Sequence, residues 1–519
     1  MFCFIDPKVS AAPLMVRVGL KERFEGVSRL LINQQKVSVG YCVNGVFAGE
    51  AVLSGGSFVF TPAAGFFYAC NKEFPSLSEA KEAADRINAA GGEAYPCAVY
   101  RNTWLLYVGG GTKAEAEVAR DKAIAATDLG FDLQVSDNGQ RVMIRYGDGA
   151  ILEDAGVMGL YLQFAPVYQN SSGIAVLELS AGESESLRSY RGRLEIGRYG
   201  KPSLTAVNVV ELEEYLYSTV SCEMATEWPL EAQKAQAVAS RSYAVSKMNN
   251  SPSFSLSNPY QLDDTTDSQV YKGAGFETEK SIAAVRATEG KTVTKDGKTI
   301  MAFFFSTSGG ATENIKDVWD YENDYLRSVP DPYETEPEVL PWVVAFTKER
   351  LRSKLEGAGI YIGAVTDVTA ENVTSSGRVN RLTIKGTLKS VTLETAKIRT
   401  VLGLMSTKFD IVKAGELPAV VFVVSADGSG TVSLSDSFFT ERGGNSVPAP
   451  DIQQYVAISD GNLTGFSAAA PSDADTFYFV GMGWGHGVGL SQSGAAGMAR
   501  AGYNYKQIIE YYYTGCKVQ

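Results

Sequence analysis

The sequence predicts an α+β fold that is rich in β-strands and carries a small inserted α+β module. Short runs that alternate apolar and polar residues recur along most of the 519 residues, as expected of half-buried strands. Helical patterns are few, and the clearest lie at 78–90, 112–126 and 230–248. Apolar residues make up 45% and charged residues 20% of the chain, which is ordinary for a globular protein with several buried cores.

Composition and charge exclude several kinds of function. Acidic residues outnumber basic ones by 59 to 47, and the net charge of −12 argues against a nucleic-acid partner, because phosphate binding needs a positive field. The single histidine, His486, excludes any site built on two imidazoles. The six cysteines form no C-x-x-C pair, so a zinc ribbon is excluded, while a disulfide between Cys70 and Cys97 stays open.

The pattern divides the chain into three parts. Residues 1–65 form a β-rich N-terminal segment. Residues 66–133 read strand–helix–strand–strand–helix–strand and predict the small module, which is inserted because strands precede it. The remaining part, 134–519, has three regions. Residues 200–335 form a helix with loops, residues 340–470 are rich in strands with one helix near 346–355, and residues 476–519 form a glycine-rich strand and a final helix.

No membrane-spanning segment is predicted. Residues 51–71 carry no charge, but they contain Pro62 and several glycines, which favours buried strands and turns over a span. The N-terminus has neither a basic region nor a long apolar stretch, so a signal peptide is not evident in this sequence.

Glycines alternate with other residues from Gly481 to Gly489. In an extended chain they would share one face, which would leave bare backbone open to close approach by a ligand or another chain. The opposite face would carry Trp484 and His486. A tightly packed buried strand with a satisfied histidine explains the pattern equally well.

Glu223 lies between two helical patterns, the second of which starts at Pro229. Its apolar neighbours Met224 and Trp228 would raise the pKa of its carboxyl group, which suits a general acid. Alternatively, Glu223 and Glu227 stabilise the start of the second helix through its dipole.

The segment 303–314 is an apolar strand that runs into small hydroxyl residues and glycines. Such residues suit hydrogen bonding to sugar hydroxyls, although an ordinary turn has the same composition. A serine nucleophile, Ser308, paired with His486 is a third interpretation, but the G-x-S-x-G elbow of hydrolases is missing.

Three strings resemble the SpoIID/LytB family of bacterial cell-wall proteins in order and spacing. They are EEYLYSTVSCEMATEWPLEAQKAQAVASRSYA, STSGGATENIKDVW…DYLRSV and GWGHGVGLSQSGAAGMARAGYNYKQIIEYYY. The resemblance covers about 200–335 and 476–519 and implies a β-rich SpoIID-type core. It also implies an extracytoplasmic lytic transglycosylase without a cofactor, which cuts peptidoglycan glycan strands that lack stem peptides.

The family's catalytic acid falls on Glu223 when its motif is carried over. Cys222 and Ala225 replace the usual serine and proline beside it. Thr312 and Tyr325 match further positions that look functional. The expected substrate-binding residues are Thr312, Tyr325, Arg241, Gln269, Tyr271, Ser308, Trp484, His486 and Gln492.

Two further stretches carry expectations from resemblance. Some family members have a zinc loop with a pattern like H-x5-C-x5-C, but Leu256, Leu262 and Ser268 stand at the ligand positions here, so no metal is expected and packing would hold the loop. Residues 66–133 resemble a SPOR domain, a module that binds denuded glycan. Its expected glycan-binding residues are Phe74, Trp104 and Tyr107.

A single carboxylate suffices for the implied reaction. The acid protonates the glycosidic oxygen after N-acetylmuramic acid and then, as a base, assists attack of the sugar's own C6 hydroxyl on C1. The product is a 1,6-anhydro sugar. Trp228, Trp484 and Tyr325 are expected to stack on sugar faces.

A second function stays open, namely a non-catalytic glycan-binding enhancer of a cell-wall amidase. The presence of Glu223 favours the enzyme. The missing zinc ligands and Ser493, where the family usually has an aromatic residue, favour the enhancer. The expected partners are therefore glycan strands and a cell-wall amidase.

Overall fold

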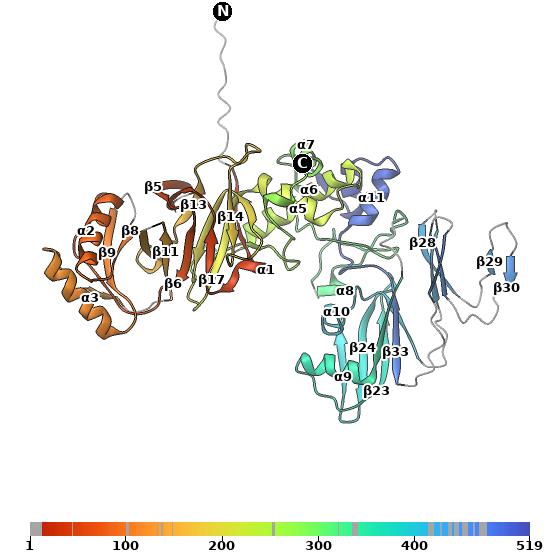
Figure 1. The fold of residues 1–519 in the computed structure, drawn as a ribbon. Coiled ribbons are helices and arrows are strands. Elements are labelled where there is room, and N and C mark those ends of the chain that lie inside the picture. The colour runs from red at the N-terminus through yellow and green to blue at the C-terminus, as the bar shows by residue number, and fades with distance from the viewer. Residues whose placement is uncertain are drawn as a thin grey trace, which may run out of the picture. The chain divides into compact units, whose positions relative to one another are not determined.

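The computed structural model describes residues 13–413 and 475–519, apart from 44, 100–102, 132, 136–138, 148, 252–254, 320 and 335–340, and only strands between 414 and 474. Helices and strands are mixed and strands prevail, which confirms the β-rich α+β prediction (Figure 1). The chain forms two compact units. Unit 1 comprises Met1–Thr226 and Ala244–Arg286, and unit 2 comprises Glu227–Tyr243 and Ala287–Gln519.

The first sheet of unit 1 runs in the order β18-β1-β17-β16-β13-β4-β5, and β2 also pairs with β17. Its strands are β1 (Met15–Gly19), β2 (Glu25–Val27), β4 (Lys36–Val43), β5 (Val46–Ser54), β13 (Gln163–Pro166), β16 (Arg193–Gly197), β17 (Leu204–Glu211) and β18 (Leu262–Asp263). Every residue of β17 before Glu211 is buried, so this strand is covered on both faces. β17 is also the strand that leads directly into the helix carrying Glu223.

The second sheet of unit 1 runs in the order β10-β7-β9-β8-β12-β11-β6-β3-β14-β15. Its strands are β3 (Leu30–Ile32), β6 (Phe58–Pro62), β7 (Phe67–Ala69), β8 (Ala94–Val99), β9 (Thr103–Gly109), β10 (Leu133–Val135), β11 (Arg141–Tyr146), β12 (Gly149–Asp154), β14 (Val176–Ser180) and β15 (Arg188–Arg191). Neighbouring strands are antiparallel except at the short pairing of β12 with β8.

The small module lies at one end of this second sheet. It has the expected order of elements, in which α2 (Leu77–Ala89) and α3 (Lys113–Ala126) alternate with strands β7 to β10. The two helices pack against each other and against β8 and β9 (Figure 1). A capping box between Thr112 and Glu115 fixes the start of α3, because each side chain satisfies a backbone N–H of the first turn.

The structure also answers the expectations about the uncharged stretch 51–71 and about Cys70 and Cys97. The uncharged stretch 51–71 forms β5, β6 and β7, as the glycines and Pro62 predicted. Among the described residues, none of the helices combines the length and apolar character needed to cross a membrane. Cys70 and Cys97 are free thiols, since β9 lies between β7 and β8 and separates them by two strand spacings.

The helical part of unit 1 follows β17. It comprises α5 (Leu212–Glu223), the last third of α6 (Leu230–Asn250), η1 (Ala274–Phe276) and α7 (Glu279–Ala287), while α1 (Lys21–Phe24) and α4 (Ala155–Met158) are single turns. The alanines of α6 have no exposed surface, which confirms the predicted close packing of this helix.

Unit 2 contains four small sheets and several helices. The sheets are β20-β19-β35, β21-β34, β22-β33-β26 and β23-β24-β25. The strands are β19 (Val293–Lys295), β20 (Lys298–Thr299), β21 (Phe304–Phe305), β22 (Trp342–Thr347), β23 (Val365–Val373), β24 (Val379–Gly386), β25 (Ser390–Glu394), β26 (Phe409–Val412), β33 (Thr476–Gly481), β34 (Leu490–Ser491) and β35 (Lys517–Val518). The helices are α8 (Lys316–Trp319), α9 (Lys348–Gly357), α10 (Ala396–Leu402), α11 (Gln492–Arg500) and α12 (Tyr505–Tyr512).

Three further hairpins belong to unit 2. They are β27 (Val420–Ser425) with β28 (Gly428–Ser433), β29 (Phe438–Thr440) with β30 (Ser446–Pro448), and β31 (Tyr455–Ser459) with β32 (Asn462–Phe466). The pairing of Ser425 with Gly428 confirms the hairpin expected there, although Asp427 itself lies outside the described residues.

Candidate functional site

Glu223 is the last residue of α5. Met224 leaves the helix with extended backbone, at φ −126° and ψ 142°. The partial negative charge at a helix C-terminus disfavours an ionised carboxylate there. The helix-start interpretation of Glu223 is therefore wrong, because the next helix begins only at Leu230. The carboxyl group therefore lies at the end of the helix where the dipole opposes a negative charge.

A backbone amide holds the Glu223 side chain. Val270 N–H donates to Glu223 Oε1 at 2.7 Å, and the side chain is half-buried. Val270 is fixed by the next residue, because Tyr271 N–H donates to Asp264 O at 3.2 Å and Tyr271 Oη–H donates to Asn208 Oδ1 at 2.7 Å. Asn208 belongs to β17, so the sheet core sets the position of the amide that contacts Glu223.

Gln269 and Tyr271 were expected to bind substrate, and both are buried. Gln269 is 1% and Tyr271 2% exposed, and the Tyr271 ring lies 5.0 Å from that of Tyr215. Their side chains flank Val270 within the core of unit 1. This placement gives them a positioning role toward Glu223.

The loop that precedes Val270 is held by more than the packing expected from the sequence. Leu262 is buried in β18 and pairs with Val18. In addition, Asp263 Oδ1 accepts hydrogen bonds from Thr265 N at 3.0 Å and from Thr265 Oγ1 at 2.7 Å. Asp263 N–H donates to Ser268 Oγ at 3.2 Å. Side chains close this loop from within.

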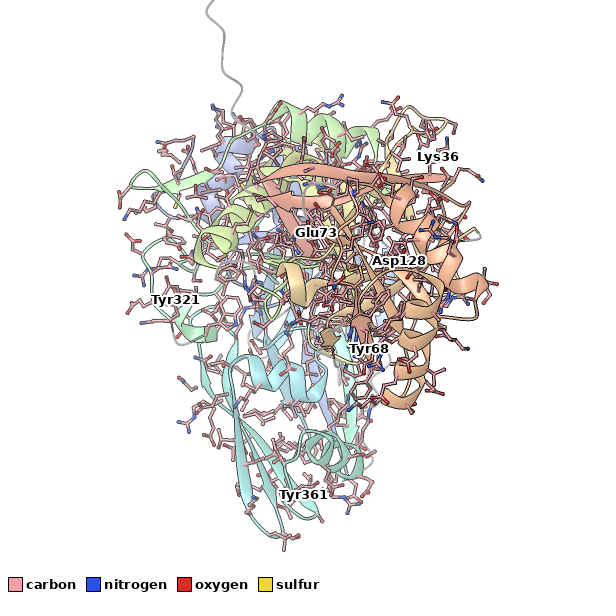
Figure 2. The ribbon with its side chains drawn as sticks, turned by 90° about the vertical axis from the view of Figure 1, so that its left-hand side faces the viewer. Lys36, Tyr68, Glu73, Asp128, Tyr321 and Tyr361 are labelled. Atoms are coloured by element: carbon pink, nitrogen blue, oxygen red, sulfur yellow. The ribbon has the colours of Figure 1, made fainter. Side chains whose placement is uncertain are left out.

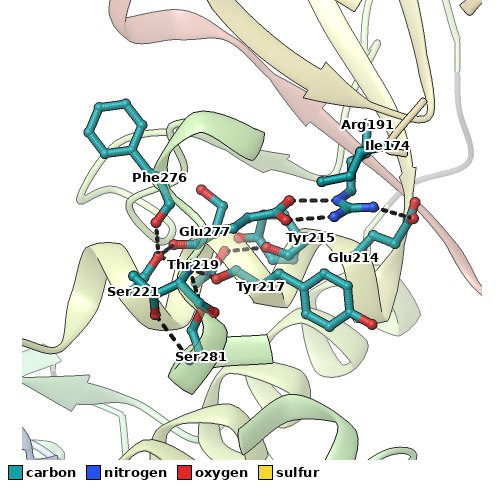
Figure 3. Close-up of polar contacts among 12 residues, drawn as sticks. Ile174, Arg191, Glu214, Tyr215, Tyr217, Thr219, Ser221, Phe276, Glu277 and Ser281 are labelled. Atoms are coloured by element: carbon teal, nitrogen blue, oxygen red, sulfur yellow. Dashed lines mark hydrogen bonds and ion pairs between the residues drawn. The ribbon is translucent and has the colours of Figure 1, made fainter. Parts of the chain in front are cut away.

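Ion pairs and hydrogen bonds anchor α5 itself (Figure 3). Arg191 donates from Nε and Nη2 to the two oxygens of Glu277, each at 2.7 Å, and from Nη1 to Glu214 at 3.2 Å. Ser221 Oγ–H donates to Phe276 O at 2.5 Å. Glu214 lies in the first turn of α5 and Ser221 in its last, so both ends of the helix are tied to their surroundings and the direction of Glu223 is defined.

The glycine-rich segment of unit 2 is not the extended strand that the alternation suggested. β33 ends at Gly481 and β34 begins at Leu490. The glycines between them, at positions 483, 485, 487 and 489, have φ between 76° and 107°, a conformation that side chains disfavour. The glycines alternate with other residues because every second residue here has a positive φ, and not because they share one face of a strand.

Close approach is confirmed, and the partner is the chain's own backbone. A Cβ atom at Gly489 would lie 2.0 Å from Phe303 O, and one at Gly483 would lie 2.9 Å from Thr307 O. Trp484 N–H donates to Thr307 O at 2.9 Å and Thr307 N–H donates to Trp484 O at 3.1 Å. The glycines let this segment lie directly against 303–308.

Ser308 is fully buried in the structural network of unit 2. Its N–H and that of Gly309 both donate to the buried carboxylate of Glu334, the second at 2.9 Å. Arg378 Nη2 donates to Ser308 O at 3.0 Å, and Gly310 N–H donates to Ser308 Oγ at 3.0 Å. These contacts hold the backbone of the loop and lend no support to a serine nucleophile paired with His486.

Three more of the expected substrate-binding residues are buried supports. Thr312 Oγ1 accepts from Val329 N at 2.8 Å. Arg241 Nη1 donates to Lys291 O at 3.0 Å, and Gln492 Nε2 donates to an α6 side chain at 3.4 Å. None of the three is more than 6% exposed. Tyr325 differs, because it is half-buried, and burial raises the pKa of its hydroxyl to about 12.

His486 lies among aromatic rings. The centroid of its ring is 4.9 Å from Trp319, 5.5 Å from Phe305 and 6.1 Å from Phe303. Val488 N–H donates to His486 Nδ1 at 3.0 Å. Burial first, and then the charges of two arginines, lower the pKa of His486 to about 3. The imidazole is therefore neutral at neutral pH and serves as an aromatic ring and not as a proton donor.

Exposed aromatic side chains adjoin this histidine. Trp319, in ring contact with His486, is 38% exposed, and Trp484, two residues before it, is 54% exposed. We call Trp319, Trp484 and His486 the aromatic surface of unit 2. Tyr321, two residues beyond Trp319, is 56% exposed and projects into solvent (Figure 2).

Other predicted aromatic contacts fall in the cores. Phe74, Trp104 and Tyr107 are at most 5% exposed, and Phe74 and Trp104 exchange backbone hydrogen bonds at 2.8 Å. The side chains expected to bind glycan in the small module therefore build its core, and their placement contradicts direct glycan contact. Trp228 is 7% exposed and offers no face to a sugar, unlike Trp484.

Sequence reasoning missed several residues that the structure brings forward. Trp319 stands in a string that carried the resemblance, so its place in that string was a usable pointer. Glu334 and Arg399 gave no pattern, because each is defined by partners that are distant in sequence. Asn208 was hidden in an apolar strand, where a lone amide marks a buried hydrogen bond.

Comparison with known proteins gives the family of this region. The family model described as Stage II sporulation protein (SpoIID) matches residues 200–294. Stage II sporulation protein D of Bacillus subtilis is 27% identical over 369 residues, covering 68% of this chain and 86% of that protein. The amidase enhancer of Bacillus subtilis is 26% identical over 472 residues, covering 85% of this chain and 62% of its own length. Stage II sporulation protein D of Bacillus amyloliquefaciens is 28% identical over 328 residues, covering 60% and 75%.

The matched range 200–294 contains α5 with Glu223, the loop with Val270, and α6. Of the three strings that suggested the family in the sequence, the first lies within this range and the other two lie beyond it, while the relatives extend the similarity over most of the chain. The small module at 66–133 is matched by no part of that family model. Residues 200–294 thus match the SpoIID family model, and the chain is similar to Stage II sporulation protein D and to the amidase enhancer.

Proposed function

We propose that this protein is a lytic transglycosylase of peptidoglycan, which uses Glu223 as its only acid and base. The SpoIID domain and the names of its relatives support a role connected with the cell wall, and hence outside the cytoplasm. The observation that carries the proposal is the placement of Glu223, half-buried at the C-terminal end of α5 and held by Val270 N–H at 2.7 Å.

In the first step, the protonated carboxyl group of Glu223 gives its proton to the glycosidic oxygen after N-acetylmuramic acid. The bond from C1 to that oxygen breaks, and positive charge develops at C1. The helix C-terminus supports this step, because its partial negative charge favours the protonated acid beforehand.

In the second step, the carboxylate accepts the proton of the sugar's C6 hydroxyl while O6 bonds to C1. The Val270 amide assists here, since an N–H donor stabilises the carboxylate form that accepts this proton. The nucleophile belongs to the same sugar, so no second carboxylate is needed to activate water. The ring closes as a 1,6-anhydro sugar, and the enzyme returns to its starting protonation state.

Binding of the glycan is assigned to the aromatic surface of unit 2. Sugar rings present apolar C–H faces that stack on indole rings, and Trp484 and Trp319 are exposed. Tyr325 remains a proposed contact because its side chain is half-buried. Six other residues that were expected to contact substrate are assigned a supporting role in the fold, because their side chains are buried. They are Thr312, Arg241, Gln269, Tyr271, Ser308 and Gln492.

The test is glycan cleavage. Wild type, Glu223→Gln and Glu227→Gln are incubated with glycan strands freed of stem peptides, and the products are separated by chromatography. Glu227 is exposed four residues further along the chain, so its variant controls for loss of a nearby charge. We expect cleavage by wild type and Glu227→Gln, and at least a thousandfold slower cleavage by Glu223→Gln. Equal rates for all three would refute the assignment.

A second candidate is an enhancer of a cell-wall amidase that binds glycan without cutting it. The similarity to the amidase enhancer favours it, because that alignment covers 85% of this chain. In this case wild type and Glu223→Gln would stimulate an amidase equally, and neither would shorten glycan.

A further inference from the structure

Arg399 forms no ion pair with any carboxylate in the part of the chain that the structure describes. It lies in α10, it is half-buried, and burial is the one cause that lowers the pKa of its guanidinium. Two other arginines of this part of unit 2 form ion pairs, Arg352 with Glu349 and Arg381 with Glu394 at 3.4 Å, whereas Arg350 and Arg378 donate to backbone carbonyls. Within the described residues, no carboxylate forms an ion pair with Arg399.

The fold brings Arg399 to the aromatic surface. Arg399 O accepts from Gly403 N at 2.8 Å and from Leu404 N at 3.0 Å, which ends the helix in a tight turn. The next residue, Met405, accepts from Gly485 N at 2.9 Å. The end of α10 is thus joined to the backbone between Trp484 and His486.

Electrostatics agree with this placement. After burial, the positive charge of Arg399 is among the causes that lower the pKa of His486. Met405 is 39% and Trp484 54% exposed, and solvent therefore reaches this neighbourhood. A half-buried guanidinium loses hydration, and an anionic ligand would restore the lost interaction.

Stem-peptide removal creates such an anion. In intact peptidoglycan, the lactyl group of each muramic acid is joined to its peptide by a neutral amide. An amidase that cleaves this bond leaves a lactyl carboxylate on the sugar. The planar guanidinium of arginine matches a carboxylate with two parallel hydrogen bonds.

We propose that Arg399 binds the lactyl carboxylate of a muramic acid residue whose ring lies on the aromatic surface, so that unit 2 selects glycan without stem peptides. This inference rests on the proposed action on glycan and adds the chemical group that is recognised. A strand that still carries peptides has no negative charge at this position and is bulkier there.

The experiment compares three probes by titration calorimetry. They are denuded glycan with free lactyl carboxylates, the same glycan with these groups converted to amides, and an N-acetylglucosamine oligomer, which lacks the lactyl group. All proteins carry Glu223→Gln, so that cleavage does not disturb the binding curve. Arg399→Gln is compared with Lys397→Gln, an exposed cation two residues away in the same helix.

We expect the free carboxylate to improve binding about tenfold over the amide, the scale of one charge-assisted hydrogen bond. Arg399→Gln abolishes this difference and keeps the affinity for the oligomer, which also shows that the variant is folded. Lys397→Gln leaves the difference intact. Equal affinity for the acid and amide forms in the parent protein would overturn the role of Arg399, whereas absence of binding to every probe would overturn the proposed function itself.

Discussion

The end of α5 in unit 1 and the glycine-rich segment of unit 2 reach defined geometry in opposite ways. At α5, the half-buried carboxyl group of Glu223 accepts a hydrogen bond from a backbone amide, Val270 N–H. In the glycine-rich segment, the backbone is held by close contact, and the polar side chains around it are buried, as Ser308 and Glu334 illustrate. The first arrangement leaves a carboxyl group partly exposed, as the proposed proton donor requires, and in the second the polar side chains hold the backbone of the chain itself.

This difference shows how to distinguish reactive residues from supporting ones among the strings that resemble one family. Residues from both regions stood together as candidates because they lie in the strings that resemble one family. Burial separates them, since a side chain such as Thr312, with 0% exposure, cannot reach a polymer. Substitution of Glu223 should therefore change activity, and substitutions of the glycines and buried polar residues in and around the glycine-rich segment should change stability.

The largest expected effect on stability comes from a substitution in the glycine-rich segment. Gly489→Ala places a Cβ atom 2.0 Å from Phe303 O at a residue with φ 85°. We expect unit 2 to lose about 3 kcal/mol of unfolding free energy, from left-handed strain and overpacking together. Urea unfolding of the full chain measures it.

The matched control is Gly502→Ala, at φ 90° with nothing within 4 Å of the added atom. It keeps the strain and omits the collision, so the loss should be about 1 kcal/mol. Equal losses in the two variants would contradict the close-contact account of the segment.

A smaller effect is expected at the support of Glu223. Tyr271→Phe removes the hydrogen bond to Asn208 and should cost about 1 kcal/mol of unfolding free energy. Because Tyr271 adjoins Val270, kcat on glycan should fall while KM stays unchanged. Tyr361→Phe, at a ring 64% exposed, should change neither quantity. An unchanged kcat in Tyr271→Phe would show that the position of Val270 does not depend on this hydrogen bond.

The smallest expected effect is on the pH dependence of the unfolding free energy, and it tests the role of His486 in the aromatic surface. The pKa of His486 is about 3, below its ordinary value of 6.5, so the unfolded chain binds a proton between these values and the folded chain does not. The contribution of His486 to stability is thus complete above pH 6.5 and is lost as the pH falls toward 3. His486→Phe should flatten this part of the curve of unfolding free energy against pH. Parallel curves for the two proteins would contradict a neutral, ring-packed histidine.

The sequence predicted elements well wherever the pattern was local. The order of the small module, the alanine packing of α6 and the strands at 51–71 follow from periodicity, caps and glycine content. It failed where conformation depended on distant partners. The alternating glycines near 485 suit a strand in sequence, yet their φ angles are set by contact with 303–308.

The candidate site was predictable in part for the same reason. Glu223 was found through its motif, and Trp484 through its place among glycines. The roles of Tyr271 and Trp104 were misjudged because aromatic residues serve cores and sugar surfaces alike, and burial is decided by tertiary packing. Arg399 could not be found, since what distinguishes it is the absence of a carboxylate partner among the described residues of the fold.

The most direct measurement of the central claim is mass spectrometry of glycan fragments formed in water enriched in oxygen-18. If Glu223 assists attack by the sugar's own hydroxyl, wild type will yield anhydro ends without the heavy isotope, and Glu223→Gln will yield none. Reducing ends that carry oxygen-18 would show attack by water, and anhydro ends from Glu223→Gln would show that another group performs the chemistry. Either result would contradict a single-carboxylate transglycosylase acting through Glu223.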